Sequence, residues 1–287
     1  MWSGQLPEGN GNRAKAAAVA AATTVVVTVG VTGFLLLGGG DRDDDADGGS
    51  ASTKAPTTAS KGTTASTPTP DSPPGATERP TVPGWKVVIN PKRGTAFDVP
   101  PDWDVKSPTL LIGFEDSEVD YNDPDNWGKV VIVMGAPAIL KEDWCVSRSK
   151  KNGRVKQNST ELAAAGTKGA SGAGSTGAAA LSQVEQWVYG GYTQPDRKSI
   201  VRDEAATPYT TKSGVKGSIA RARSRNAPRT DACASDGKAI TFGFRNSAGD
   251  LVAWSLYGAT GVKNELPDST VMKILGTVRL HGDPTES

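Results

Sequence analysis

The stretch KAITFGFRNSAGDLVAWSLYG, residues 238–258, places apolar side chains at every second position on both sides of a short polar turn. These apolar residues are Ile240, Phe242, Phe244, Val252, Trp254 and Leu256. Alternate positions along a strand share one face, and the turn 246–250 carries Gly249. The pattern therefore predicts a β-hairpin with one buried face.

Further runs rich in Val, Ile and aromatic residues precede this hairpin. They predict strands at 85–90, 96–100, 103–107, 110–114 and 129–134. Apolar residues at helical spacing predict helices over 178–189 and 267–278. The Ala- and Gly-rich segment 160–177 is expected to be a mobile loop with a short helical start. Consecutive hairpins with few helices predict an α+β fold, in which helices flank an antiparallel sheet.

The N-terminal part of the chain predicts a membrane anchor. Ala16–Leu37 carries no charge and as a helix would span ~33 Å, close to the hydrocarbon thickness of a bilayer. Arg13 and Lys15 precede this run and an Asp cluster follows it, so the positive-inside rule places the N-terminus in the cytoplasm. We expect a cytoplasmic tail (1–15), one transmembrane helix (16–37) and an extracytoplasmic remainder. A cleaved export signal and a buried core helix are the alternatives.

Residues 38–83 are dominated by Gly, Ser, Thr, Pro and Asp. A segment with so few apolar residues cannot offset its ordering entropy by burial, so we expect a disordered stalk. It is either a spacer that lifts a domain off the membrane or a linker without a selected length. The composition changes at Gly84, which predicts an extracytoplasmic domain over 84–282 and a flexible tail over 283–287.

The chain has two cysteines, Cys145 and Cys233. An even number in an exported domain predicts a disulfide. It would either tie the segment between the cysteines to the hairpin or act as a redox pair, although no Cys-x-x-Cys spacing occurs. Within the predicted domain 84–282, we expect residues 141–215 to be an insertion into a simpler fold.

Catalytic patterns are sparse. The single histidine, His281, lies near the end of the chain and is expected to be solvated rather than a general base. Ser-x-x-Lys, which needs no histidine, occurs at 147–150, 213–216 and 235–238. We expect no enzyme activity, no catalytic residue, no cofactor and no bound metal, with a Ser-Lys or carboxylate enzyme of the cell envelope as the alternative.

An acidic segment follows the predicted strand 110–114. Its carboxylates are Glu115, Asp116, Glu118, Asp120, Asp123 and Asp125. Clustered oxygen ligands suit calcium, but the spacing departs from the EF-hand loop. The segment is therefore either a solvated acidic loop or an irregular cation site.

Two basic segments lie close to the cysteines. We call them together the basic patch, and its members are Arg148, Lys150, Lys151, Arg154, Lys156, Arg221, Arg223, Arg225 and Arg229. A disulfide would bring the two segments together on a chain whose net charge is only +1. Arginine rows suit phosphate and other anions. The patch is either an anion-binding surface or an exposed sheet face balanced by the acidic segment.

The turn and core motifs AFDVPPDWDV (96–105) and LPDSTVMKILGTVRL (266–280) resemble the PsbP-like and LpqN-like extracytoplasmic domains. The layout, with its opening GWKVVINPKRGTAFDVPPDW (84–103), also resembles uncharacterised single-pass surface proteins of high-GC Gram-positive bacteria. The resemblance implies an antiparallel sheet with flanking helices and carries over no catalytic set.

These observations predict a membrane-anchored binding or scaffold module at the cell envelope. Its expected partners are the membrane and an anionic cell-wall polymer or another envelope protein. Nucleic acid is not expected, because no aromatic residues for base stacking are interleaved with the basic ones.

Overall fold

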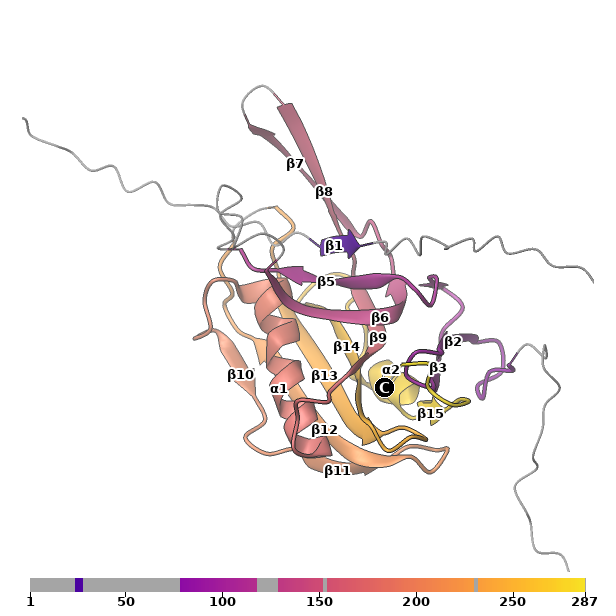
Figure 1. The fold of residues 1–287 in the computed structure, drawn as a ribbon. Helices are drawn as coiled ribbons and strands as arrows, with labels where there is room; N and C mark the ends of the chain where they lie inside the picture. Colours follow the sequence, from indigo (N-terminus) through magenta and orange to yellow (C-terminus); the bar gives the residue numbers. More distant parts are fainter. Residues whose placement is uncertain (1–23, 28–77, 118–128, 152–153, 230–231, 287) are drawn as a thin grey trace, which may run out of the picture. The chain divides into compact units, whose positions relative to one another are not determined.

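The computed structural model describes residues 24–27, 78–117, 129–151, 154–229 and 232–286 (Figure 1). The described residues form mainly antiparallel strands, with two α-helices and one π-helical turn, which confirms an α+β arrangement. The strands are β1 (Thr24–Val27), β2 (Lys86–Asn90), β3 (Thr95–Val99), β4 (Trp103–Val105), β5 (Leu111–Glu115), β6 (Val130–Leu140), β7 (Cys145–Lys151), β8 (Arg154–Thr160), β9 (Ala163–Gly169), β10 (Ile200–Arg202), β11 (Thr207–Thr210), β12 (Lys216–Ser224), β13 (Asp236–Arg245), β14 (Leu251–Thr260) and β15 (Arg279–Leu280). The helical elements are α1 (Thr176–Val188), the π-helical turn η2 (Tyr189–Thr193) and α2 (Asp268–Leu275).

Within the described residues, the main sheet has ten strands in the order β1-β5-β6-β9-β14-β13-β12-β10, with β11 paired to β12 and β4 paired to β6. The hairpin predicted from 238–258 is β13–β14, and Phe242 lies opposite Trp254 in its register. The Asn246 N–H donates to the Asp250 carbonyl across the turn, where Gly249 has a φ of +85° that favours glycine. Two smaller sheets have the orders β15-β3-β2 and β7-β8.

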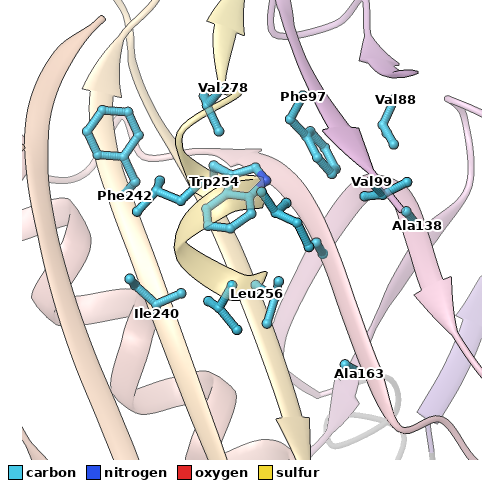
Figure 2. Close-up of a cluster of buried hydrophobic side chains, with 14 of the residues drawn as sticks. Val88, Phe97, Val99, Ala138, Ala163, Ile240, Phe242, Trp254, Leu256 and Val278 are labelled. Carbon is cyan, nitrogen blue, oxygen red and sulfur yellow. The ribbon is translucent and has the colours of Figure 1, made fainter. Parts of the chain in front are cut away.

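The two faces of the main sheet bury separate apolar clusters. On one face, the small sheet β15-β3-β2 and α2 cover β13 and β14, and Phe97 meets Trp254 edge-on with ring centroids 5.9 Å apart (Figure 2). On the other face, α1 packs on β12, β13 and β14, and Trp187 stacks on Tyr257 at 5.1 Å. Each such side chain contributes roughly 1.5–3 kcal/mol by burial, so the sheet is held from both sides.

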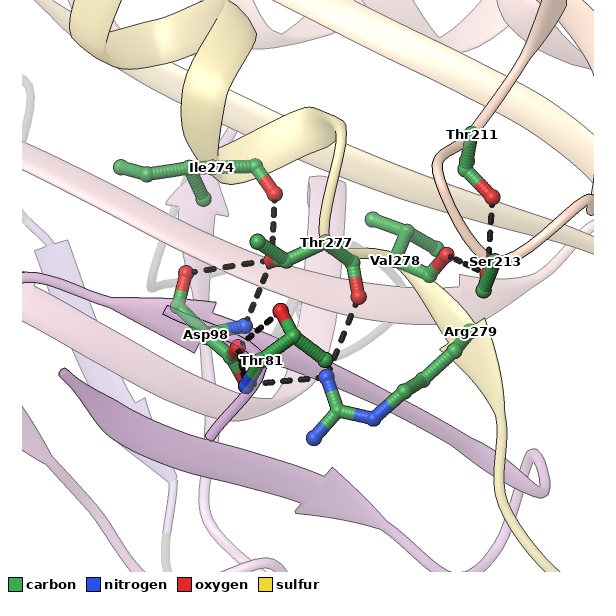
Figure 3. A network of polar contacts seen from close by, with 8 residues as sticks. All are labelled: Thr81, Asp98, Thr211, Ser213, Ile274, Thr277, Val278 and Arg279. Carbon is green, nitrogen blue, oxygen red and sulfur yellow. Dashed lines mark hydrogen bonds and ion pairs between the residues drawn. The ribbon is translucent and has the colours of Figure 1, made fainter. Parts of the chain in front are cut away.

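A buried ion pair connects the two ends of the domain (Figure 3). Asp98 is fully buried, and Arg279 Nη1 lies 2.8 Å from Asp98 Oδ1. The backbone N–H and the hydroxyl of Thr81 both donate to Asp98 Oδ2 at 2.6 Å. Near the other end, the Thr285 N–H donates to the Pro91 carbonyl at 3.0 Å. The ordered contacts therefore extend beyond the predicted limits 84 and 282 at both ends.

The predicted loop over 160–177 is wrong. The structure places β9 in the interior of the main sheet, between β6 and β14, with Ala163, Ala164 and Ala165 fully buried. A Cβ at Gly166 would lie 2.9 Å from the Gly135 carbonyl oxygen, so small residues let the strands approach closely. Alanine and glycine are depleted in strands, which is why composition favoured a loop. Segment 141–215, predicted to be an insertion, supplies both β9 and α1 and so forms part of the core.

The predicted transmembrane helix 16–37 lies largely outside the described residues. Four of its residues are described, and they form β1, which pairs with β5 at one edge of the main sheet rather than making a helical turn. Their sequence, TVVV, is β-branched throughout and suits a strand. In the described part of the chain, no helix is long and apolar enough to cross a membrane. The predicted stalk is described only from residue 78 onward.

Candidate functional site

The second basic segment of the patch lies on β12. Arg221 and Arg223 are exposed and alternate with the buried residues Ala220, Ala222 and Ser224, as the sequence pattern predicts. Arg221 is opposite Ile240, and Arg223 is opposite Lys238 on β13. The Arg side chains therefore point to the face that carries α2, because α1 packs on the alanine face.

These two arginines line a cavity of about 350 Å³ between β12, β13 and α2. Its charged lining residues are Arg221, Arg223, Lys238, Glu265 and Asp268, and its apolar ones include Ile240, Leu256, Val271 and Met272. Three basic and two acidic residues give a net charge of +1. The cavity thus combines an apolar floor with a mildly positive rim.

Acidic groups neutralise much of this rim. Lys238 Nζ lies 2.8 Å from Glu265 Oε1 and 2.6 Å from Asp268 Oδ1. The hydrogen bond from Lys238 lowers the pKa of the Asp268 carboxyl, and the charges of Arg223 and Arg221 lower it further. Asp268 thus faces all three cations, so the balancing acids come from α2 and the loop before it.

Past the end of β12, a carboxylate organises the loop that carries Arg225 and Arg229. Asp236 accepts hydrogen bonds from the Ser224 hydroxyl at 2.8 Å and from the Ala227 N–H at 2.9 Å. Burial alone would raise the pKa of Asp236, but these hydrogen bonds and Arg229 lower it overall. Both arginines are exposed, so the loop presents two cations beyond the strand.

The disulfide joins the two basic segments as the sequence predicts. Cys145, the first residue of β7, is bonded to Cys233 just before β13, with Cα atoms 5.6 Å apart. The hairpin β7–β8 extends away from the rest of the domain in Figure 1, and Arg148 on it is exposed. Across the hairpin, the Lys151 and Arg154 backbones are paired. The structure does not describe the side chains of four further patch residues, Lys150, Lys151, Arg154 and Lys156. That the two basic segments form one continuous face therefore stays a prediction.

The remaining candidates are the Ser-x-x-Lys motifs, His281 and the acidic segment. Their described residues make contacts that hold the fold together, and the others lie outside the described residues. The Ser213 hydroxyl donates to the Val278 carbonyl at 2.8 Å (Figure 3), and Lys238 of the third Ser-x-x-Lys is held by Glu265 and Asp268. The His281 N–H donates to the Gly94 carbonyl beside β15. In the acidic segment, residues 118–128 are outside the described residues, and no group of three potential metal ligands occurs among those described.

A larger cavity of about 720 Å³ was missed by the sequence reasoning. We call it the basic cavity, and its charged lining residues are Lys92, Arg93, Lys168, Arg245, Asp250 and Glu286. The bases come from the β2–β3 turn, β9 and the end of β13, so no contiguous basic run marks them. The run Lys92–Arg93 in NPKRG was the one visible signal.

A family model described as "Domain of unknown function (DUF8017)" matches residues 78–283. The chain belongs to the DUF8017 family. The DUF8017 match begins six residues before Gly84, in agreement with the hydrogen bonds that Thr81 makes to Asp98. The comparison with curated proteins gave no match.

Proposed function

We propose that this DUF8017 protein is a non-catalytic binding module displayed on the outer side of a cell membrane, where its basic patch holds an anionic wall polymer. The observation that carries the proposal is the Cys145–Cys233 disulfide, which ties the basic hairpin β7–β8 to the arginine-bearing β12–β13 connection. One covalent link thus supports two basic segments that are far apart in sequence.

The disulfide also supports the extracytoplasmic location, because such bonds persist in oxidising compartments. The uncharged run 16–37, with basic residues before it and acids after it, favours a single-pass anchor with the DUF8017 domain outside. The motifs of 96–105 and 266–280 support a relationship to PsbP-like and LpqN-like domains and to surface proteins of high-GC Gram-positive bacteria.

The ligand class follows from the exposed arginines. Among the described residues, Arg223 and Arg225 make no ion pair, so their guanidinium groups are available to phosphate or carboxylate groups on a polymer. Each exposed contact of this kind contributes roughly 0.2–1 kcal/mol. Useful affinity therefore requires several contacts at once, which a repeating polymer supplies and a single small anion does not.

The test is co-sedimentation of the full chain, in detergent and with the disulfide intact, with purified bacterial cell wall. Changing Arg221, Arg223 and Arg225 together to Ala should weaken binding about tenfold and flatten its salt dependence. The matched control changes Lys212, Lys216 and Lys263 to Ala, which removes the same charge from exposed positions outside the patch. Equal loss in both triple variants, or no binding at low salt, would rule out the patch as the binding surface.

A further inference from the structure

The basic cavity shares no residue with the basic patch and carries more uncompensated charge. Four basic and two acidic lining residues give it a net charge of +2, compared with +1 at the β12–α2 cavity. Its volume, about 720 Å³, lies within the roughly 300–1,000 Å³ typical of small-molecule sites. Size and charge together favour an anionic ligand larger than a simple ion.

Two of its cations, Arg93 and Lys168, border the same part of β9. A Cβ at Gly169 would lie 3.1 Å from Cζ and Nη1 of Arg93, so the guanidinium lies against the β9 backbone where glycine leaves room. The neighbouring Lys168 is partly buried, and this burial, followed by the charge of Arg93, lowers the pKa of its ammonium group. Arg93 and Lys168 thus both line the cavity, where a bound anion would lessen the repulsion between their charges.

A carboxylate of the same chain already lies at this cavity. Glu286 Oε1 is 2.7 Å from Lys92 Nζ, and Glu286 Oε2 is 3.8 Å from Arg93 Nη2. The segment is positioned by its backbone, because the Glu286 N–H donates to the Lys92 carbonyl at 3.2 Å. Both side chains of the Lys92–Glu286 pair are almost half exposed, so the contact is weak and another carboxylate can replace it.

The cavity also contains a buried polar group that suits a hydroxyl donor. Asn90 is 3% exposed, and its Nδ2 donates to Thr167 Oγ1 at 2.7 Å. Its Oδ1 has no hydrogen-bond partner within the described part of the chain. A buried amide oxygen without a donor is unfavourable, and a ligand hydroxyl would satisfy it.

We propose that the basic cavity binds a carboxylated sugar, whose carboxylate replaces that of Glu286 at Lys92 and Arg93 beside the further cation Lys168, and whose hydroxyl donates to Asn90. Cations with a nearby hydroxyl acceptor match the two functional groups of a uronic acid. Glu286 is then an internal competitor that occupies the carboxylate position when no ligand is bound. The proposal does not depend on the function proposed for the basic patch.

The test is isothermal titration calorimetry of the full chain in detergent with trigalacturonate as the probe. The neutral trisaccharide maltotriose and inorganic phosphate serve as comparison ligands. We expect trigalacturonate to bind and maltotriose not to bind. Phosphate binding as tight as that of trigalacturonate would overturn the assignment to a carboxylated sugar, because phosphate brings charge without the sugar hydroxyls.

Two sets of variants give opposite expectations. Lys168→Gln and Arg93→Gln should each weaken trigalacturonate binding at least about tenfold, because each removes a charged contact. Glu286→Gln should instead tighten it by up to about fivefold, because the weak internal ion pair no longer competes. Lys168→Gln keeps the test valid if Arg93→Gln fails to fold.

The control variant changes Lys216 and Lys263, exposed residues outside both this cavity and the basic patch, to Ala and should leave trigalacturonate binding unchanged. The inference is overturned if neither the wild-type chain nor Glu286→Gln binds trigalacturonate. It is also overturned if Glu286→Gln binds more weakly than the wild type, since a competitor cannot contribute to affinity.

Discussion

At the residue scale, Asp98 is a fully buried carboxylate that accepts hydrogen bonds from Arg279 and from Thr81 at once. Asp98→Asn keeps the shape of the side chain but removes the charge that faces the guanidinium. We expect a loss of about 3–5 kcal/mol in the free energy of unfolding, measured by urea denaturation. Glu142→Gln, at the exposed ion pair with Lys106, should cost less than about 1 kcal/mol; a similar loss in both variants would contradict this explanation.

Asp236 gives the residue-scale prediction for pH. Its folded pKa is lowered, so its stabilising effect is complete above the unfolded value of about 3.9 and is lost as pH falls through the lower folded pKa. Asp236→Asn should therefore be less stable than the wild type near neutral pH, and the difference should shrink in acid. Thermal unfolding midpoints of both proteins across pH 2–7 check this, and a constant difference would show that the carboxylate charge has no role.

At the scale of elements, the approach of α1 to the main sheet depends on Gly243. A Cβ there would lie 2.2 Å from the Thr176 carbonyl oxygen, so Gly243→Ala has to move the start of the helix or the strand. We expect a destabilisation of about 1–3 kcal/mol by urea denaturation. Gly172→Ala is the matched control, because a Cβ at Gly172 meets nothing within 4 Å and should change stability by less than about 1 kcal/mol.

The same elements show what the sequence could predict about the fold. The β13–β14 hairpin was predictable because Phe242 and Trp254 belong to alternating apolar runs with a Gly-containing turn between them. The α2 helix was predictable because Val271, Ile274 and Leu275 repeat at helical spacing. In contrast, β9 was not predictable. Its Ala and Gly side chains are small enough to fit between two neighbouring strands, but these residues have low strand propensity.

At the scale of the whole molecule, the two candidate sites differ in how visible they are in the sequence. The arginines of β12 lie within one short stretch, so their shared exposure followed from period-two spacing. The basic cavity takes Arg93, Lys168 and Arg245 from separate segments, and only the pairing of β9 with β14 and the docking of the β2–β3 turn bring them together. Such a site is a product of topology, which local patterns do not encode.

The disulfide is the whole-molecule feature with the clearest measurable consequence. It joins cysteines 88 residues apart, and in the chain-entropy model a loop of that length contributes about 4.6 kcal/mol, a value that structure in the unfolded chain reduces. Changing Cys145 and Cys233 together to Ala should therefore lower the free energy of unfolding by about 2–4 kcal/mol.

Wall binding should fall as well, because the basic hairpin β7–β8 loses its covalent link to the loop that carries Arg225 and Arg229. Urea denaturation and wall co-sedimentation on the same preparation separate the two effects. Lower stability with unchanged wall binding would mean that the disulfide supports only the fold. The link between the two basic segments would then no longer support the proposed function.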